Sequence, residues 1–211
     1  MKVLITGFEP FRKNEKYRYK ENPAEKLIKA LNRNPITNVD LKLEVLPVSY
    51  KRAKKKLKEM LNDSKPDYLV MFGYYPEAMS FEIERVAINE KGTSQNGKSP
   101  LVDNDGKSPR GKISNGPESY EATFPVHELK EAFDKYKIPY KESTWPGTFV
   151  CNHCFYNALR EIEQKSLQTQ VAFIHIPSFR KILAYPEGAR ARISVDQVIK
   201  SLQHVFSSLQ Q

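Results

Sequence analysis

The chain lacks the long apolar segments of a membrane protein and has little cysteine. No apolar run approaches the roughly 18 residues that a spanning helix needs, and the first residues reach the charged Glu9 before a signal-peptide core can form. We therefore expect a soluble, non-secreted protein with no membrane partner. The two cysteines, Cys151 and Cys154, are too close in sequence to staple distant parts of a fold, which favours a reducing compartment and free thiols.

Glycine-rich phosphate loops and metal-ligand spacings are also missing. The 9 glycines form neither GxGxxG nor GxxxxGK[ST], so no dinucleotide loop or P-loop is indicated. The Cys-Asn-His-Cys run at 151–154 lies within one helical turn and cannot surround a tetrahedral zinc ion, and no second CxxC or HxxxH pair exists. We expect neither a metal nor a cofactor.

The charge balance is basic, with 34 Lys+Arg against 25 Asp+Glu and a formal net charge of +9. The run 51–58 is the best sequence argument for nucleic-acid binding. At helical spacing, however, Ala53, Leu57 and Met60 form an apolar side, which makes the charges a solvated helix face. No aromatic residues are interleaved to stack bases, so nucleic acid is the less favoured partner.

The 39% of hydrophobic residues occur in short apolar runs that alternate with amphipathic stretches. This pattern is typical of an α/β domain with a mostly parallel sheet covered on both faces. We see no repeat and no second domain, so residues 1–211 are expected to form one domain. The expected strands are 2–6, 39–46, 68–72, 81–88, 140–145 and 171–176, and the expected helices are 23–32, 50–62, 127–136, 151–163 and, after a capping box of Ser194 and Gln197, about 195–209.

A long segment without predicted regular structure interrupts this alternation. Residues 89–125 are rich in Gly, Ser, Asn, Asp and Pro, yet contain scattered apolar residues that can pack. We interpret the segment as an ordered excursion, named here the 89–125 excursion. Such long loops in compact domains are uncommon and tend to be functional or mobile.

Cys151 is the candidate nucleophile. It follows Pro146–Val150 at the start of a predicted helix, where unsatisfied backbone N–H groups and the helix dipole favour a thiolate. The alternative is a small buried apolar residue, a description that Cys154 fits better.

His175 ends an apolar strand, at the edge where open α/β sheets bind ligands, so it is a candidate base. The alternative is a core histidine satisfied by one hydrogen bond. Glu82 and Glu84 lie two apart on one face of the strand 81–88, and we expect one of them to point inward and orient the imidazole. The alternative for Glu84 is an ion pair with a neighbouring cation. The weaker histidine candidates are His127, His153 and His204.

Four segments resemble the type I pyroglutamyl peptidases, or pyrrolidone-carboxylate peptidases, a family of cysteine exopeptidases that remove an N-terminal pyroglutamyl residue. They are MKVLITGFEPF at 1–11, IERVAIN at 83–89, GTFVCNHCFY at 147–156 and FIHIP at 173–177. Their order and spacing agree with the family over nearly the whole chain. The resemblance implies a catalytic triad of Cys151, His175 and Glu84, and peptides with N-terminal pyroglutamate as substrates.

The same resemblance implies further features of the fold and the pocket. It implies an open α/β sandwich, a cytoplasmic location, no cofactor and a homo-oligomer, usually a tetramer. Phe8 and Phe11 are then expected to stack on the flat lactam ring, Asn22 to contact the pocket region, and Phe149 and Val150 to line it beside the nucleophile. An apolar slot suits this uncharged ring.

The chain departs from the family at four places, one of which is Pro146 where alanine is usual. Arg12 and Lys13 stand where two glycines are usual, residues 74–77 replace a small glycine-rich turn, and residues 90–101 lack an arginine that normally supports the reaction centre. We expect Tyr74 to stand near the ligand, where its bulk narrows the slot. Two alternatives therefore stay open: a relative with altered acyl specificity, and a catalytically weakened protein that binds a peptide or partner.

Overall fold

The computed structural model describes residues 1–11, 21–93, 100–178 and 193–210. The strands of this described part are β1 (Lys2–Phe8), β2 (Asp40–Leu46), β3 (Tyr68–Tyr74), β4 (Phe81–Glu84), β5 (Val86–Ile88), β6 (Ser119–Glu121), β7 (Tyr140–Ser143) and β8 (Gln170–Ile176). Its helices are α1 (Pro23–Arg33), α2 (Tyr50–Ser64), α3 (Val126–Lys135), α4 (Val150–Gln164) and α5 (Val195–Ser208). Arg12, Lys13 and residues 94–99 of the 89–125 excursion lie outside the described residues.

The central sheet is mixed but mostly parallel, as the alternation of apolar and amphipathic segments predicted. Its order is β2-β1-β3-β8-β4-β7 across the part of the chain that the structure describes. The first four strands are parallel, whereas β4 runs antiparallel to β8 and parallel to β7. β1, β3 and β8 are mostly apolar and buried along nearly their whole length, because helices cover both faces of the sheet.

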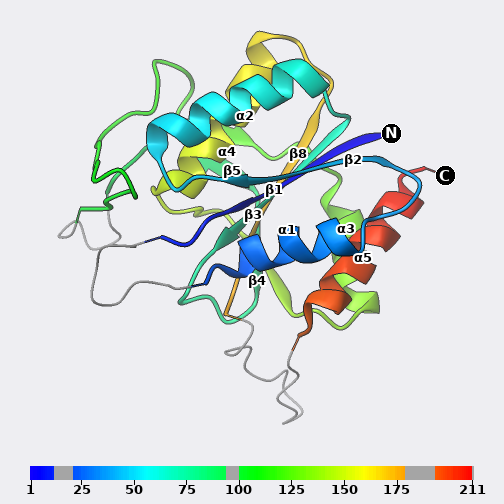
Figure 1. Cartoon of the computed structure of the whole chain (residues 1–211). Helices are drawn as coiled ribbons and strands as arrows, with labels where there is room; N and C mark the ends of the chain where they lie inside the picture. Colours follow the sequence, from blue (N-terminus) through cyan, green and yellow to red (C-terminus); the bar gives the residue numbers. More distant parts are fainter. Residues whose placement is uncertain (12–20, 94–99, 179–192, 211) are drawn as a thin grey trace.

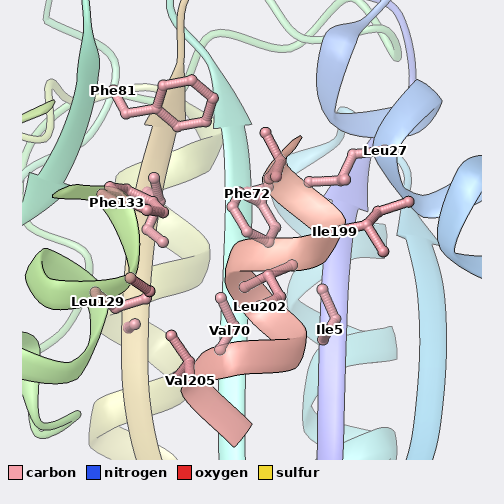
Figure 2. Packing of buried hydrophobic residues seen from close by; sticks show 14 of the residues in the cluster. Ile5, Leu27, Val70, Phe72, Phe81, Leu129, Phe133, Ile199, Leu202 and Val205 are labelled. Atoms are coloured by element: carbon pink, nitrogen blue, oxygen red, sulfur yellow. The ribbon is translucent and has the colours of Figure 1, made fainter. Parts of the chain in front are cut away.

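Two apolar layers hold the helices on the sheet and make a single α/β domain. α1, α3 and α5 cover one face, and α2 and α4 cover the other (Figure 1). Successive residues of β1 serve opposite layers, because side chains alternate along a strand: Ile5 packs with the first and Leu4 with the second. Figure 2 shows α5 lying across the first face, with Leu202 and Val205 beside Val70 of β3.

Local side-chain caps begin three of the helices. The Asn22 side chain accepts a hydrogen bond from the backbone N–H of Ala24 at 2.9 Å, and Ser49 accepts one from Arg52 at 3.1 Å. The predicted capping box of Ser194 and Gln197 is present at the start of α5. None of the helices in the described ranges is long and apolar enough to cross a membrane.

The expectation of one strand over 81–88 was wrong, because the chain changes sheets at Arg85. The Arg85 backbone N–H donates to Ser143 in the central sheet at 2.7 Å, and its carbonyl accepts from Ala122 at 2.8 Å. β5 therefore pairs with β6 in a separate two-stranded sheet. The alternation of apolar and polar residues over 81–84 ends at Arg85, where an apolar run over 86–88 begins, but neither pattern indicates which strand each half pairs with.

Side-chain hydrogen bonds hold the described residues of the 89–125 excursion, which contain the short strand β6. Asn89 anchors one part, because its side-chain oxygen accepts from the N–H groups of Ile113 and Ser114 at 2.8 and 3.0 Å. Asp103 anchors another by accepting from the N–H of Tyr50 at 3.0 Å, in the first turn of α2. These side chains accept hydrogen bonds from backbone N–H groups that have no partner in a helix or a sheet.

Leu202→Ala is expected to lower the free energy of unfolding by about 2–5 kcal/mol, because it removes a fully buried side chain between α5 and the sheet. Urea denaturation followed by circular dichroism measures the change. The control is Lys200→Ala on the exposed side of the same helix, for which a change within about 0.5 kcal/mol is expected. Equal effects of the two substitutions would contradict the assignment of this layer.

Candidate active site

Cys151 lies in the first turn of α4, one residue after the helix begins at Val150. Gly147, just before the helix, has a φ of +70°. This left-handed backbone conformation is strained for residues with a Cβ atom and is readily adopted by glycine. Cys151 is partly exposed, whereas Cys154 is fully buried. The first backbone N–H groups of a helix have no partner within it, and together with the helix dipole they attract a thiolate.

His175 and Glu84 form a buried hydrogen bond from neighbouring strands. His175 Nδ1 lies 2.7 Å from Glu84 Oε1, and the exposed fractions of the two residues are 6% and 0%. Glu82, directly opposite His175 in the antiparallel register, instead pairs with Lys141 at 2.9 Å. The side chains of Glu82 and Glu84 are therefore both buried. Glu84, which lies diagonally across from His175 in the strand register, is the one that contacts the imidazole.

His175 also hydrogen-bonds to the side chain of Cys151, so the ring has a hydrogen-bond partner on each side. Burial alone lowers the pKa of His175, but the hydrogen bonds to Cys151 and Glu84 and the charges of both groups raise it to about 10. The ring is then protonated at neutral pH. A protonated imidazole beside a cysteine favours the thiolate, which is the nucleophilic form of the sulfur.

A cavity of about 380 Å³ opens above Cys151 and His175 and is walled by aromatic rings. The ring of Phe11 lies 6.1 Å from that of Tyr74 and 6.1 Å from that of Phe149, measured between centroids. These three rings come from the segments that follow β1, end β3 and precede α4. The cavity thus brings together five of the residues predicted from the sequence to form the site.

Three other predicted residues do not line this cavity. Phe8 and Val150 are 2% and 1% exposed and pack in the layer beneath α2 and α4. Asn22 caps α1, and its side-chain amide donates to the backbone oxygen of Glu9 at 3.0 Å, so it holds the segment that leads to Phe11. A direct contact of these three with a ligand stays a prediction.

Sequence reasoning missed several lining residues. Tyr75 has its ring 5.9 Å from that of His175, and Trp145 is 46% exposed at the rim. The position of Trp145 just before the cysteine segment was a signal that could have found it. Leu101 and Val102, from the 89–125 excursion, form part of the wall and carried no such signal, because only the folded chain brings them there.

Hydrogen bonds connect the residues on both sides of Cys151 to the segment that follows β4. The N–H of Gly92 donates to the carbonyl of Thr148 at 2.7 Å. The side chain of Asn152 accepts from the N–H of Ile88 at 2.9 Å and donates to the carbonyls of Ile88 and Glu90 at 2.8 and 2.9 Å. The position of the thiol therefore depends on the excursion being in place.

His153 is buried in α4 next to this site and lies on a different side of the helix from the Cys151–His175 contact. Its ring packs edge-on against Tyr50 at 5.3 Å, and its Nδ1 has no hydrogen-bond partner among the described residues. Burial, with smaller contributions from the charges of Lys54 and Lys91, lowers the pKa of His153 to about 3. His153 is therefore a neutral core histidine at neutral pH.

No three His, Cys, Asp or Glu side chains within residues 1–11, 21–93, 100–178 and 193–210 are grouped so that they could hold a metal ion. At the cavity a thiol lies beside an imidazole, with a carboxylate behind the imidazole and the first backbone N–H groups of α4 at the thiol. Such a set is suited to nucleophilic acyl transfer.

The chain is similar to known proteins over nearly its whole length. The family model for pyroglutamyl peptidase matches residues 1–210. The pyrrolidone-carboxylate peptidases of Brachyspira hyodysenteriae and Thermococcus kodakarensis are each 32% identical to this chain, and each match covers 99% of this chain and 98% of the relative.

Solved structures of the same kind share the fold. A mutant pyrrolidone carboxyl peptidase from P. furiosus superposes with a TM-score of 0.81 at 28% identity, over 100% of this chain and 99% of that one. Pyroglutamyl peptidase I of Bacillus amyloliquefaciens gives a TM-score of 0.79 at 30% identity, over 97% of this chain and 94% of its own.

Iodoacetamide is expected to modify Cys151 well before Cys154 at neutral pH. Cys154 is fully buried, and its pKa is raised by burial and by the charge of Cys151, so it stays a thiol. His175→Ala is expected to slow modification of Cys151 at pH 6 at least about tenfold, because an unassisted thiol is mostly protonated there. Mass spectrometry of timed samples measures both rates, with the unfolded protein as control. Similar rates for the two folded thiols would contradict the assignment.

The low pKa of His153 predicts a loss of stability in acid. Below pH 6.5 the unfolded chain binds a proton that the folded chain takes up only near pH 3, so the free energy of unfolding falls between these values. His153→Gln is expected to flatten the profile in this window, measured by urea denaturation at a series of pH values. The control is the exposed His127→Gln, which is expected to keep the wild-type slope. A wild-type slope in His153→Gln would refute the explanation.

Proposed function

The chain belongs to the pyroglutamyl peptidase family of cysteine exopeptidases, and from this premise we propose that it removes N-terminal pyroglutamyl residues from peptides with Cys151, His175 and Glu84 as a catalytic triad. The observation that carries the proposal is the contact of one buried imidazole with both other groups: a hydrogen bond to the Cys151 side chain, and Nδ1 at 2.7 Å from Glu84. These contacts support the roles of nucleophile, base and orienting group that acyl transfer requires.

In the proposed reaction the Cys151 thiolate attacks the pyroglutamyl carbonyl carbon. The imidazolium of His175 gives its proton to the leaving amine as the carbon–nitrogen bond breaks, which leaves a thioester on the sulfur. The neutral ring then takes a proton from water, the resulting hydroxide releases pyroglutamate, and the thiolate and the imidazolium are restored. Glu84 keeps a proton on Nδ1, so that Nε2 is the atom that exchanges protons with the reactants.

The tetrahedral intermediate carries a negative oxygen that needs hydrogen-bond donors. The backbone N–H of Cys151 supports this role because it lies in the first turn of α4, where no carbonyl of the helix accepts it. The positive end of the helix dipole adds to the stabilisation.

The shape of the cavity supports a flat, uncharged acyl group. Phe11, Tyr74 and Phe149 line the cavity with aromatic rings, a setting in which a five-membered lactam gains apolar contact without burying a charge. Tyr74 also supports the second candidate, a peptidase for a different small or cyclic acyl group, because its ring narrows the same slot.

Turnover of a pyroglutamyl chromogenic anilide tests the proposal. Cys151→Ser is expected to lower kcat by at least about a thousandfold, and Glu84→Gln by about 10²–10⁴-fold, because the imidazole loses its orienting carboxylate. The matched control is Cys154→Ser, the neighbouring thiol, which is expected to keep most of the activity. A panel of other blocked anilides, prolyl and acetyl among them, identifies altered acyl specificity. No turnover of any of them by the wild type would favour a binding protein instead.

A further inference from the structure

A second cavity lies beside the one that contains Cys151. Its volume is about 300 Å³, and it shares Tyr75, Glu77 and Trp145 with the first cavity, so the two are neighbours across a common wall. Its remaining lining residues come from the turn before β4, from β4 itself and from β7, namely Ala78, Met79, Ser80, Glu82, Lys141 and Ser143. The triad and the aromatic slot make no use of these residues.

The order of the strands places the rings of Phe11 and Tyr74 on one side of His175 and the unshared lining of the second cavity on the other. Phe11 and Tyr74 follow or end β1 and β3, on one side of β8, whereas β4 and β7 lie on its other side. In acyl transfer the acyl group and the leaving amine extend in opposite directions from the scissile bond, and the amine leaves toward the group that protonates it. An acyl group in the aromatic slot therefore directs the rest of the peptide across His175 toward the second cavity.

The walls of the second cavity contain exposed apolar side chains, the ion pair of Glu82 with Lys141, and the acidic Glu77. Met79 and Trp145 are 48% and 46% exposed, so both present apolar surface to a ligand without rearranging. The buried Glu82 is neutralised by Lys141 at 2.9 Å. Glu77 is exposed and lines both cavities, which leaves a negative charge at the shared rim.

We propose that this second cavity is the leaving-group subsite, which receives the residue after pyroglutamate, and that Trp145 makes it select peptides with a large apolar or aromatic residue there. Glu77 disfavours an acidic residue at the same position by repulsion between like charges. The proposal rests on the proposed function, since it takes the aromatic slot to be the acyl site. It adds a specificity-determining residue and a class of peptide to that function.

Binding to the Cys151→Ser protein tests the subsite without turnover. Isothermal titration with the amides of pyroglutamyl-phenylalanine, pyroglutamyl-glycine and pyroglutamyl-glutamate is expected to give about three- to tenfold tighter binding of the first than of the second, and the weakest binding of the third. The chain has a single tryptophan, so its fluorescence reports on Trp145 alone. The phenylalanine ligand is expected to change that emission more than the glycine ligand does. Equal affinities, or no binding of any ligand, would overturn the subsite.

Further substitutions in the Cys151→Ser protein test whether Trp145 is the residue that causes the difference in affinity. Trp145→Ala is expected to bring the phenylalanine-to-glycine affinity ratio close to one, and Trp145→Phe to retain most of it, which separates lost stacking from lost folding. The matched control is Val102→Ala, because Val102 is another exposed apolar residue but lines only the first cavity. Val102→Ala is expected to change the affinities for the phenylalanine and glycine ligands by the same factor, so that their ratio stays as in the parent protein. An unchanged ratio in Trp145→Ala would overturn the proposal.

Anilide turnover by the wild type separates the two claims. Activity on the anilide together with a flat affinity ratio would refute the subsite and leave the proposed function standing. A ratio that depends on Trp145 in a protein that fails to cleave the anilide would support the subsite and refute the catalytic proposal.

Discussion

The buried hydrogen bond between His175 and Glu84 is the interaction on which the site depends. A carboxylate with no exposed surface is costly to bury unless a cation or hydrogen bonds compensate it, and the imidazole at 2.7 Å does so. The bond in turn raises the pKa of the ring, which favours the thiolate of Cys151. It exists because β4 runs antiparallel to β8, a register that brings Glu84 diagonally to His175 and Glu82 directly opposite it.

A second requirement is that irregular backbone be held firmly beside the nucleophile. Asn89 and Asp103 belong to the excursion, and Asn152 belongs to α4. The side chain of each forms hydrogen bonds with backbone groups beside the site. Buried backbone without such partners is unfavourable, so these bonds let a long segment, with no helix among its described residues, pack as one wall of the cavity. The site is therefore built by the excursion as well as by the sheet.

The basic helix α2 illustrates a charge pattern that was interpreted from the sequence as a solvated face. Its apolar side packs in the second layer, through Ala53 and Leu57. Its charged side pairs with acidic residues from other elements, including Arg52 with Asp105 at 2.6 Å and Lys56 with Glu44 at 2.7 Å. Exposed pairs of this kind contribute little stability each, and here they distribute the charge over the surface rather than concentrate it.

Periodicity along the sequence was sufficient for the type and order of nearly every element, because burial of one face imposes a repeat of 3.6 or 2 residues on the chain itself. Cys151 and His175 could be singled out for the same reason, since each stands at the end of an element where sites form. Periodicity could not choose between Glu82 and Glu84, a choice that only the family resemblance indicated. The pairing of the two halves of 81–88 with different sheets and the contribution of Leu101 and Val102 to the first cavity were decided only by the tertiary structure. These features depend on which strands pair and in which register, and pairings between residues far apart in the chain leave no local pattern.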